Sequence, residues 1–389
     1  MQVLARSGSP TGPTRCTIAR SRDWSCPSTV ENGTCRWPRP SGRGLREERT
    51  LAKILIYGAT GYTGRMIARR AAKRGLNFSV GGRDASKVVA LSTELGVDGL
   101  VLDADDRIAL GAAVAAADCV INAAGPFAAT ARQVIRACLD NSAHYIDITG
   151  EVGVFELAYS LDAEARDAGV MLMPGAGWDV VPSDCIALHV ALRATGAEWL
   201  RIGLAHIHGV PSRGTLRTGS LIGNRKIVRR GGVLVDLDYS PPLVELNFGL
   251  RSFTCELLPM GDVVTAFKST GIPNIAVYGP KSPASRMLEG GLEAFPEGPT
   301  KEQNARWRAL ALAEAKAADG RIVRSVIETG SGYEFTAAAS IEIAERIAQG
   351  RYTSGFQSPA SAYGVSLATE LGGRITDLDG QSRPARSRA

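Results

Sequence analysis

The sequence has few of the features that mark a membrane protein, a hydrolase or a disulfide-rich protein. No run of about 18 apolar residues occurs, so no membrane span is expected. The cysteines number seven, an odd count, and none forms a C-x-x-C pair, which fits a reducing, cytosolic setting. A G-x-S-x-G elbow and a Walker lysine motif are both missing, which argues against hydrolase and P-loop functions.

The net positive charge outside the first fifty residues is also small. Nine arginines and four acids there account for +5 of the net charge of +6, which leaves +1 for residues 51–389. A nucleic-acid partner is therefore not expected. Residues 1–50 are rich in Ser, Pro, Gly, Thr and Arg without a periodic pattern, and we predict a disordered or non-native extension. A transit peptide and an upstream start codon are the two alternatives for this segment.

A glycine-rich turn follows the first apolar run, Ile54 to Tyr57. The sequence G-A-T-G-Y-T-G continues into an amphipathic stretch, which predicts a buried strand, a tight turn and a helix. Such a turn presents helix N-terminal N–H groups to a pyrophosphate, although an ordinary tight turn is the alternative. The residues of this turn predicted to bind the cofactor are Gly58, Thr60, Gly61, Tyr62, Thr63 and Gly64.

The second strand predicts which dinucleotide binds. An NAD-binding protein carries an acid near the end of this strand, about 20 residues beyond the glycines, for the ribose hydroxyls. Here Arg83 takes that place and Lys87 follows one helical turn later. A guanidinium suits a 2′-phosphate, so we predict NADP as the cofactor; the alternative is a solvated loop cation.

Strands and helices alternate from Lys53 to Met173, which predicts a doubly wound α/β sheet of six strands. Cofactor contacts belong at the carboxyl ends of such strands. The further cofactor-binding residues predicted at these ends are Asp103, Asn122, Ala123, Gly125, Pro126 and Phe127.

The pattern changes after Glu198, which predicts a second, α+β domain with a mixed sheet. Predicted strands there include 263–269 and 274–279, and predicted helices include 215–230, 285–294 and 301–318. The predicted organisation is an NADP-binding domain at 51–195, a substrate or oligomerisation domain at 196–333, C-terminal helices packing back at 334–378, and a disordered tail at 379–389.

Five linked motifs resemble the saccharopine-dehydrogenase-like oxidoreductases. They are G-A-T-G-Y-T-G (58–64), G-G-R-D (81–84), N-A-A-G-P-F (122–127), H-Y-I-D-I-T-G-E (144–151) and P-G-A-G-W-D-V-V-P-S-D (174–184). G-F-Q-S-P-A-S-A-Y-G at 355–364 is similar as well, so the resemblance spreads over residues 51–372. Within the family, the sequence looks most like the mycobacterial-type trans-acting enoyl reductases, which act with polyketide synthases in glycolipid assembly.

The sequence indicates the catalytic residues less clearly than it indicates the cofactor-binding residues. Tyr145 and Asp147 alternate on one predicted strand, so they share a face and could act as proton donor and positioning group, although a structural role is the alternative. Glu151, Asp179 and Asp184 are further candidates.

The predicted substrate-binding residues are Trp178, Asp179, Arg213 and Arg217, with a solvated helix face as the alternative for the arginines. His206 and His208 share a strand face, but with no third ligand nearby we predict no metal site.

Three functions follow from these observations. The first is an NADPH-dependent reductase of a carbon–carbon double bond in a carrier-bound acyl chain, in lipid or polyketide biosynthesis. The second is a saccharopine-type amino-acid dehydrogenase acting on an imine, and the third is a non-catalytic NADP sensor. Expected partners are a small-molecule or carrier-bound substrate, a polyketide synthase and a second copy in a homodimer, in the cytoplasm or at the periphery of the inner membrane.

Overall fold

The computed structural model describes residues 52–222, 225–280, 291–292 and 295–379. The predicted extension at 1–50, the predicted helix at 285–294 except residues 291–292, and all of the predicted tail beyond residue 379 lie outside these residues. Asp379 itself is described, and its carboxylate accepts a hydrogen bond from the Arg324 backbone N–H at 2.8 Å.

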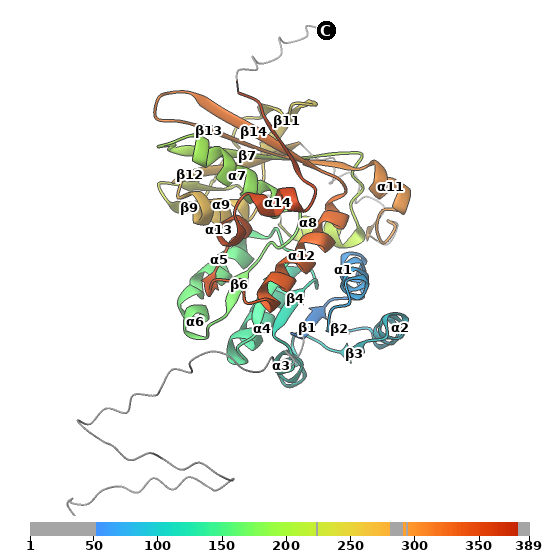
Figure 1. Cartoon of the computed structure of the whole chain (residues 1–389). Helices are drawn as coiled ribbons and strands as arrows, with labels where there is room; N and C mark the ends of the chain where they lie inside the picture. Colours follow the sequence, from blue (N-terminus) through green and yellow to red (C-terminus); the bar gives the residue numbers. More distant parts are fainter. Residues whose placement is uncertain (1–51, 223–224, 281–290, 293–294, 380–389) are drawn as a thin grey trace, which may run out of the picture. The chain divides into compact units, whose positions relative to one another are not determined.

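A parallel sheet carries the first half of the described chain (Figure 1). Its strand order is β15-β6-β5-β4-β1-β2-β3, and every pairing is parallel. The strands are β1 (Ile54–Tyr57), β2 (Phe78–Gly82), β3 (Asp98–Val101), β4 (Cys119–Asn122), β5 (His144–Asp147), β6 (Met171–Met173) and β15 (Gly355–Phe356). The first six strands match the prediction, and the doubly wound α/β fold is confirmed.

The helices between these strands begin and end with recognisable signals. Asp84 caps α2 by accepting the Lys87 N–H, and Gly96 ends it in the left-handed conformation. The helices are α1 (Tyr62–Lys73), α2 (Ala85–Leu95), α3 (Arg107–Ala115), α4 (Phe127–Asp140), α5 (Val152–Ser160), α6 (Asp162–Asp167) and α7 (Val181–Arg193).

A second, mixed sheet follows α7, as predicted. Its order is β10-β11-β12-β7-β13-β14-β16, with β8 pairing β12 and β9. The strands are β7 (Trp199–Ile207), β8 (Ile227–Arg230), β9 (Val233–Asp236), β10 (Val244–Asn247), β11 (Ser252–Leu257), β12 (Asn274–Pro280), β13 (Arg308–Lys316), β14 (Ile322–Thr329) and β16 (Arg374–Asp377). The helices here are α8 (Arg213–Ile222), α9 (Asp262–Thr270) and α11 (Lys301–Arg306).

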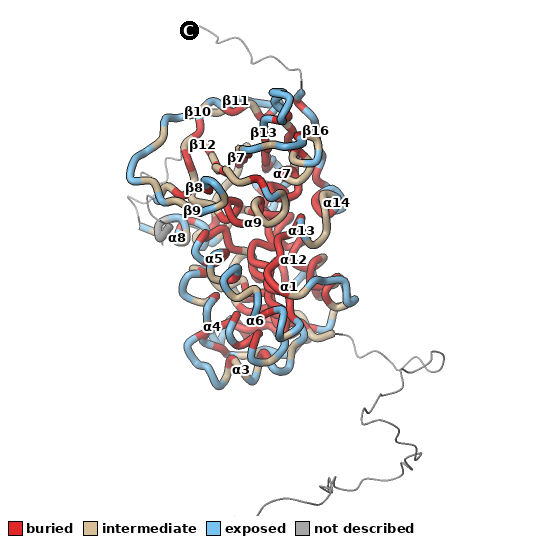
Figure 2. Tube along the Cα trace, turned by 90° about the vertical axis from the view of Figure 1, so that its left-hand side faces the viewer, coloured by how far each residue is buried: buried red, intermediate tan, exposed pale blue. Residues whose placement is uncertain are grey.

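The C-terminal segment joins both sheets. Helix α12 (Gly332–Ala348) packs against α1, β4 and β5, and β15 pairs with β6 of the parallel sheet. Helices α13 (Pro359–Tyr363) and α14 (Ser366–Glu370) pack on α7, while β16 pairs with β14 of the mixed sheet. The buried stretch through α12 and α1 is continuous in Figure 2. The described residues between 52 and 379 accordingly form one compact unit.

Three predictions in the second half are wrong. Residues 263–269 lie in helix α9 and not in a strand, because Gly261 and Gly271 bound a helix whose first five residues are all buried. The predicted helix at 301–318 ends at Arg306 and continues as strand β13, whose core-facing alanines pack between β7 and β14. The predicted helix at 215–230 ends at Ile222, and β8 follows.

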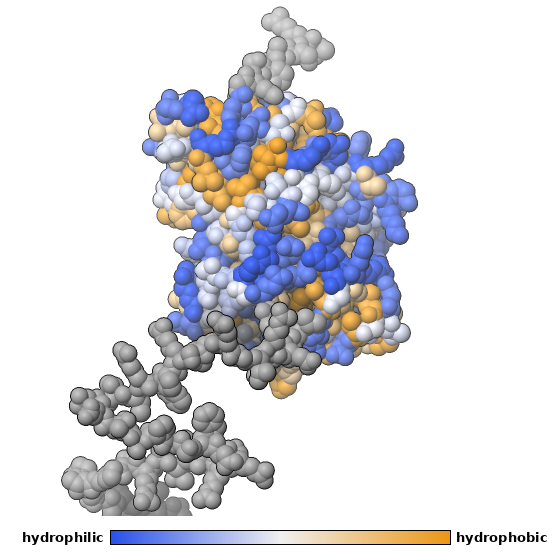
Figure 3. All heavy atoms as spheres, in the orientation of Figure 1, coloured by the Kyte–Doolittle hydropathy of each residue, from blue (hydrophilic) through white to orange (hydrophobic). Residues whose placement is uncertain are grey.

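Apolar side chains are not confined to the interior. Figure 3 shows hydrophobic atoms gathered over the mixed sheet between hydrophilic bands. A small cluster centred on Phe248 and Leu312 is buried on this sheet, separately from the main core. No helix of the described residues is long and apolar enough to cross a bilayer.

Candidate functional site

A cavity of about 860 Å³ lies at the carboxyl edge of the parallel sheet. Loops after β1, β2, β4, β5 and β6 form one wall, which is where doubly wound folds bind nucleotides. Residues from the mixed sheet and from α8 and α12 form the other wall. The volume is in the range of cofactor and ligand sites.

The glycine turn has the shape that a pyrophosphate requires. Gly58 has φ +79°, and a Cβ there would lie 2.5 Å from the Ala124 backbone nitrogen. A Cβ on Gly64 would lie 2.2 Å from the Gly58 carbonyl oxygen, so only glycine lets α1 approach the turn this closely. Gly61, by contrast, is exposed, and the nearest atom to an added Cβ is 3.5 Å away. The cradle therefore opens where phosphate would approach the backbone.

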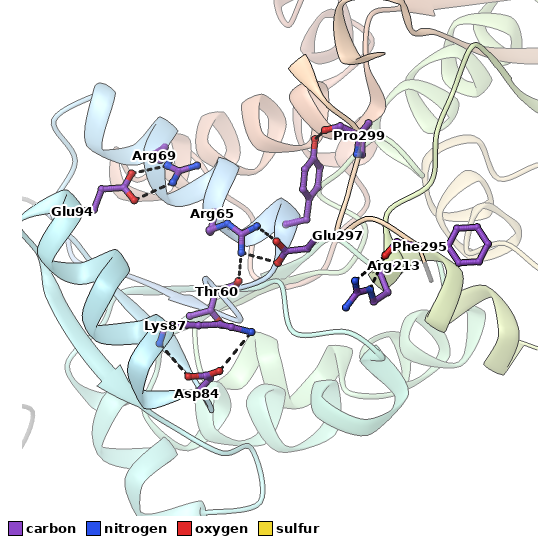
Figure 4. Close-up of polar contacts among 11 residues, drawn as sticks. Thr60, Arg65, Arg69, Asp84, Lys87, Glu94, Arg213, Phe295, Glu297 and Pro299 are labelled. Atoms are coloured by element: carbon purple, nitrogen blue, oxygen red, sulfur yellow. Dashed lines mark hydrogen bonds and ion pairs between the residues drawn. The ribbon is translucent and has the colours of Figure 1, made fainter. Parts of the chain in front are cut away.

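Two cations line the cavity beyond this turn. Arg83 and Lys87 both border it, and Arg83 is exposed at the end of β2. Asp84, the acid beside them, is engaged locally: its carboxylate accepts from the Lys87 N–H at 3.1 Å and the Ser86 hydroxyl at 2.6 Å, and pairs with the Lys87 ammonium at 3.5 Å (Figure 4). These hydrogen bonds, the Ser86 one first, lower the pKa of Asp84. The arrangement suits an anionic 2′-phosphate better than a ribose diol.

A short segment, Phe295–Thr300, crosses the entrance of the glycine turn, and we call it the strap. The Glu297 carboxylate binds the Arg65 guanidinium through two hydrogen bonds of 2.8 and 2.6 Å, and Arg65 also donates to the Thr60 carbonyl at 2.6 Å (Figure 4). The hydrogen bonds from Arg65 lower the pKa of Glu297, and Lys87 and Arg213 add to this effect.

Further contacts hold the strap. The Arg213 guanidinium donates to the Phe295 carbonyl at 2.8 Å, and the Tyr62 hydroxyl donates to the Pro299 carbonyl at 2.8 Å. The strap therefore ties the start of α1 to α8.

The predicted catalytic pair does not reach the cavity. Tyr145 and Asp147 are fully buried and do not line it. The Tyr145 hydroxyl donates to Asp147 Oδ2 at 2.7 Å, and Asp147 Oδ1 accepts from the backbone N–H groups of Thr149 and Gly175 at 3.0 and 2.9 Å. Burial raises the pKa of Asp147 to about 7 and that of Tyr145 well above its ordinary value. The geometry favours the structural alternative, in which this pair fixes the loops after β5 and β6.

Hydrogen bonds to buried polar side chains fix the conformation of the loop after β4. Asn122 is buried; its carbonyl oxygen accepts the Ala124 N–H at 3.0 Å, and its amide donates to Thr130 and Tyr145. Glu151 accepts the first two N–H groups of α4, from Phe127 and Ala128, each at 2.8 Å. This carboxylate therefore occupies the start of α4.

Only some of the cofactor-binding residues predicted after β3 and β4 line the cavity. Ala123, Gly125 and Phe127 line the cavity, while Asn122, Pro126 and Asp103 do not. Asp103 is exposed, accepts the Asp105 N–H at 3.1 Å, and raises the pKa of the neighbouring Tyr57, whose own burial is the larger cause.

Five aromatic rings run in contact from the glycine turn, across the wall on the mixed sheet, to the loop after β6. Ring centroids are 5.1 Å apart for Tyr62 and Tyr333, 5.4 Å for Tyr333 and Trp307, 5.2 Å for Trp307 and His206, and 4.3 Å for His206 and Trp178. All five residues line the cavity. We call this set the aromatic column, and it joins the two walls.

Polar groups face the cavity beside the column. The Tyr333 hydroxyl lies 2.7 Å from Thr215 Oγ1 and accepts the Ser212 N–H at 2.6 Å. Asp179 lines the cavity, and burial raises the pKa of its carboxyl to about 6. The predicted substrate residues Trp178, Asp179, Arg213 and Arg217 all border the cavity.

The histidines do not form a metal site. His206 lines the cavity and accepts a hydrogen bond from Trp307, while His208 is exposed outside the cavity lining with φ +59°. Within the described part of the chain, no three His, Cys, Asp or Glu side chains are grouped so that they could hold a metal ion.

Sequence reasoning missed most of the second wall. Tyr333, Trp307, Met260, Ser212 and Glu297 come from separate segments that carry no shared motif. Among the residues of this wall, His206 was noted on an alternating strand. It was considered there only as a potential metal ligand together with His208.

Comparison with known proteins agrees with the nucleotide site. The family described as the saccharopine dehydrogenase NADP binding domain matches residues 54–173. The "lipid droplet localized protein" of Caenorhabditis elegans is 30% identical over 145 residues, 34% of this chain and 34% of that protein. A "putative trans-acting enoyl reductase" of Mycobacterium tuberculosis is 32% identical over 154 residues, 37% of each chain. The "saccharopine dehydrogenase-like oxidoreductase" of Homo sapiens is 25% identical over 189 residues, 43% of this chain and 44% of that protein.

The similarity to these relatives is partial, and the aligned spans cover between about a third and somewhat under half of their length. A solved structure, apo saccharopine dehydrogenase (L-Glu forming) from Saccharomyces cerevisiae, superimposes with a TM-score of 0.56 over 84% of this chain and 100% of that chain, at 13% identity. That likeness shows the fold of both sheets and nothing of the reaction. Residues 54–173 match a saccharopine dehydrogenase-type NADP-binding domain, which confirms the predicted cofactor and agrees with the resemblance of this part of the chain.

Proposed function

We propose that this chain is an NADPH-dependent oxidoreductase that reduces a carbon–carbon double bond conjugated to the carbonyl of a carrier-bound acyl chain. The observation that carries the proposal is the single cavity that extends from the glycine turn to the aromatic column. One end has the backbone and cations for a phosphorylated dinucleotide, and the other end has rings that suit an apolar chain.

The cofactor-binding residues proposed from the sequence fit this arrangement. Gly58, Gly61 and Gly64 would hold the pyrophosphate, and Arg83 with Lys87 the 2′-phosphate. Ala123, Gly125 and Phe127 would border the nicotinamide end. Bound NADPH supplies a hydride.

The chain's own residues then serve to orient the acyl group and exclude water. Trp178, Trp307 and Met260 would enclose the acyl chain and displace water from around it. Asp179 faces the cavity with a pKa raised to about 6, so it can pass a proton near neutral pH.

A carrier-bound substrate is supported by charge at the cavity rim. Arg213 and Arg217 of α8 border the cavity, and they suit a phosphopantetheine phosphate or an acidic carrier surface. The printed name of the mycobacterial relative describes a trans-acting enoyl reductase, which supports a separate synthase as the partner. The relative named for lipid droplets supports action at a lipid surface, in the cytoplasm or at the inner membrane.

Imine reduction is the second candidate, favoured by the same two arginines, because an amino-dicarboxylate product needs paired guanidinium groups. Arg213 already donates to the Phe295 carbonyl at 2.8 Å, so it would have to serve both partners. We therefore rank this candidate below acyl reduction.

The test begins with cofactor affinity and ends with turnover. Fluorescence titration should give a much lower Kd for NADPH than for NADH, and equal values would remove the role of Arg83. Oxidation of NADPH should then follow addition of trans-octenoyl-N-acetylcysteamine and not of glutamate with aminoadipate semialdehyde. Transfer of deuterium from labelled NADPH to the β-carbon would exclude a non-catalytic sensor, whereas tight NADPH binding without turnover of either substrate would favour it.

A further inference from the structure

We propose that His206 is the group that hydrogen-bonds the carbonyl oxygen of the substrate, as a neutral imidazole whose proton Trp307 confines to Nε2. This rests on the proposed function for the identity of the carbonyl compound. It does not rest on any residue of the predicted catalytic pair, which is buried beneath the cavity.

The tautomer follows from hydrogen-bond chemistry. The indole Nε1 of Trp307 lies 3.1 Å from His206 Nδ1. An indole nitrogen only donates, so His206 Nδ1 must accept and carries no proton. A neutral imidazole then has its single proton on Nε2, the nitrogen at the other side of the ring.

The ring is also held in place. The Trp178 ring lies 4.3 Å from His206 at an interplanar angle of 47°, and the Trp307 ring meets it edge-on at 87°. Trp178 is fixed in turn, because its indole donates to Thr329 and its backbone N–H to Thr336, both at 2.9 Å. A donor fixed by its neighbours is pre-organised for its acceptor.

The His206 ring is exposed to the cavity and is flanked by the rings of Trp178 and Trp307. That environment lowers the pKa of His206 to about 4, with burial as the cause. The ionisable residues bordering the same cavity on the side of His206 are Asp179 on the loop after β6, Tyr333 on α12, and Arg213 and Arg217 on α8. Those toward the glycine turn are Tyr57, Tyr62, Arg83, Asp84, Lys87 and Glu297. The imidazole is therefore neutral at physiological pH and serves as a donor, not as an acid.

The role fits the electron flow of the proposed reaction. When hydride adds to the β-carbon of an enoyl thioester, the double-bond electron pair moves toward the carbonyl oxygen, and a proton passed by Asp179 later joins the α-carbon. The enoyl group is reduced and NADPH is oxidised. His206 forms and breaks no covalent bond, and its N–H meets the charge that develops on the oxygen.

The first test is spectroscopic and needs no substrate. Long-range proton–nitrogen NMR of histidine-labelled protein with NADP⁺ resolves four histidines, and His206→Phe identifies the signal of interest. We expect Nε2 protonated, Nδ1 unprotonated, and no titration between about pH 5 and pH 8. In Trp307→Phe the two tautomers should average. A proton on Nδ1, or titration near neutral pH, would overturn the proposal.

The second test asks whether a carbonyl reaches this proton. Octanoyl-N-acetylcysteamine and pyruvate, added to the NADP⁺ complex, serve as unreactive carbonyl probes. We expect the octanoyl probe to move the His206 Nε2 proton downfield. A shift with pyruvate alone would keep His206 as the carbonyl donor and remove the acyl substrate. No shift with either probe would overturn the inference.

Turnover provides the third readout, and its variants separate donation from packing. With trans-octenoyl-N-acetylcysteamine, His206→Phe should lower kcat about 100-fold, with KM changed less than about threefold. His206→Gln, whose amide can donate from a similar position, should recover about a tenth of the wild-type kcat. The matched control, His208→Gln, lies outside the cavity lining and should change neither value. Equal loss in the Phe and Gln variants would indicate a packing role only.

Discussion

The two walls of the cavity are built from different materials. The cofactor end of the wall on the parallel sheet is largely backbone: three glycines, the loop after β4 and the start of α1, all between Gly58 and Phe127. The wall on the mixed sheet is made of side chains from β7, α8, α12 and the loops before α9 and β13, which are far apart in the chain. Binding at the first wall is therefore most sensitive to an added side chain that obstructs the backbone. Binding at the second wall is most sensitive to the exchange of a single side chain.

This difference also separates what each wall does. Dinucleotide phosphate is the same in every such protein, so a backbone cradle serves it well. The substrate varies among relatives, and side chains can change one at a time without disturbing a strand. The aromatic column is the place where the two walls touch, through Tyr62 and Tyr333.

The largest effect should come from closing the glycine cradle. In Gly64→Ala the new Cβ would lie 2.2 Å from the Gly58 carbonyl oxygen, so α1 must move away from β1. We expect a loss of about 3 kcal/mol in unfolding free energy by urea titration, together with loss of NADPH binding. Gly111→Ala in α3, with nothing within 4 Å of the added Cβ, is the control and should be neutral or slightly stabilising. Equal stability of the two variants would refute a close-packed cradle.

Removal of Arg83 should have the next largest effect and sharpen the comparison of the two walls. At this point the parallel-sheet wall depends on a side chain to select the cofactor. Arg83→Gln should weaken NADPH binding about 10- to 100-fold and leave NADH binding unchanged, since only NADPH carries the 2′-phosphate. Fluorescence titration measures both. Arg70→Ala, exposed on α1 outside the cavity lining, provides the matched change of charge and should affect neither cofactor. A parallel loss for NADH would mean that Arg83 does not read the phosphate.

The substrate side should also be sensitive to pH. Asp262, at the start of α9 two residues beyond Met260, is fully buried, and burial raises its pKa from 3.8 to about 7, with Asp184 and Asp179 adding to the shift. Because the folded state holds this proton more tightly than the unfolded chain, stability is full below about pH 4 and is lost as the pH rises through 7. Asp262→Asn should remove part of this slope, about 2 kcal/mol between pH 5 and pH 8 in urea titrations. An unchanged slope would show that Asp262 is not the buried acid responsible.

The smallest effect should come from the strap, which spans both walls. Glu297 and Arg65 are partly exposed, and such pairs contribute little. Glu297→Gln should therefore raise the dissociation rate of NADPH only about two- to fivefold in stopped-flow measurements, because one attachment of the strap is lost. Glu94→Gln removes a comparable exposed pair with Arg69 on the same helix and should leave the rate unchanged. A slower release in Glu297→Gln would mean that the carboxylate repels the cofactor more than it holds the strap.

The sequence was informative where structure is local. The first six strands and the glycine turn each depend on neighbouring residues, so pattern and turn chemistry predicted them. Helix α9 was missed because V-V-T-A-F looks like a strand, and only burial against α7 and α5 makes it helical. His206 and Trp307 were missed as partners because the register of β7 on β13 brings them together, and no local signal reports that register.

The predicted catalytic pair is the opposite case, because its residues stand out in the sequence but do not line the cavity. Tyr145 and Asp147 carry the residue types of an acid–base pair and sit at a strand end, which is where a site is expected. Their side chains nevertheless point beneath the loops, and two backbone N–H groups take up the carboxylate. Alternation places residues on a face but does not tell which face opens to solvent.

The edge strand β15 has a consequence for how this protein is made. It completes the parallel sheet from residues 355–356, more than 180 residues after β6, and α12 covers β4 and β5 from a similar distance along the chain. A ribosome that has synthesised only the first two hundred residues has therefore released every glycine of the turn but not the pieces that shield the sheet. The nascent chain must keep this apolar edge away from other proteins until synthesis is almost complete, so β15 contributes to the yield of a site whose cavity it does not line.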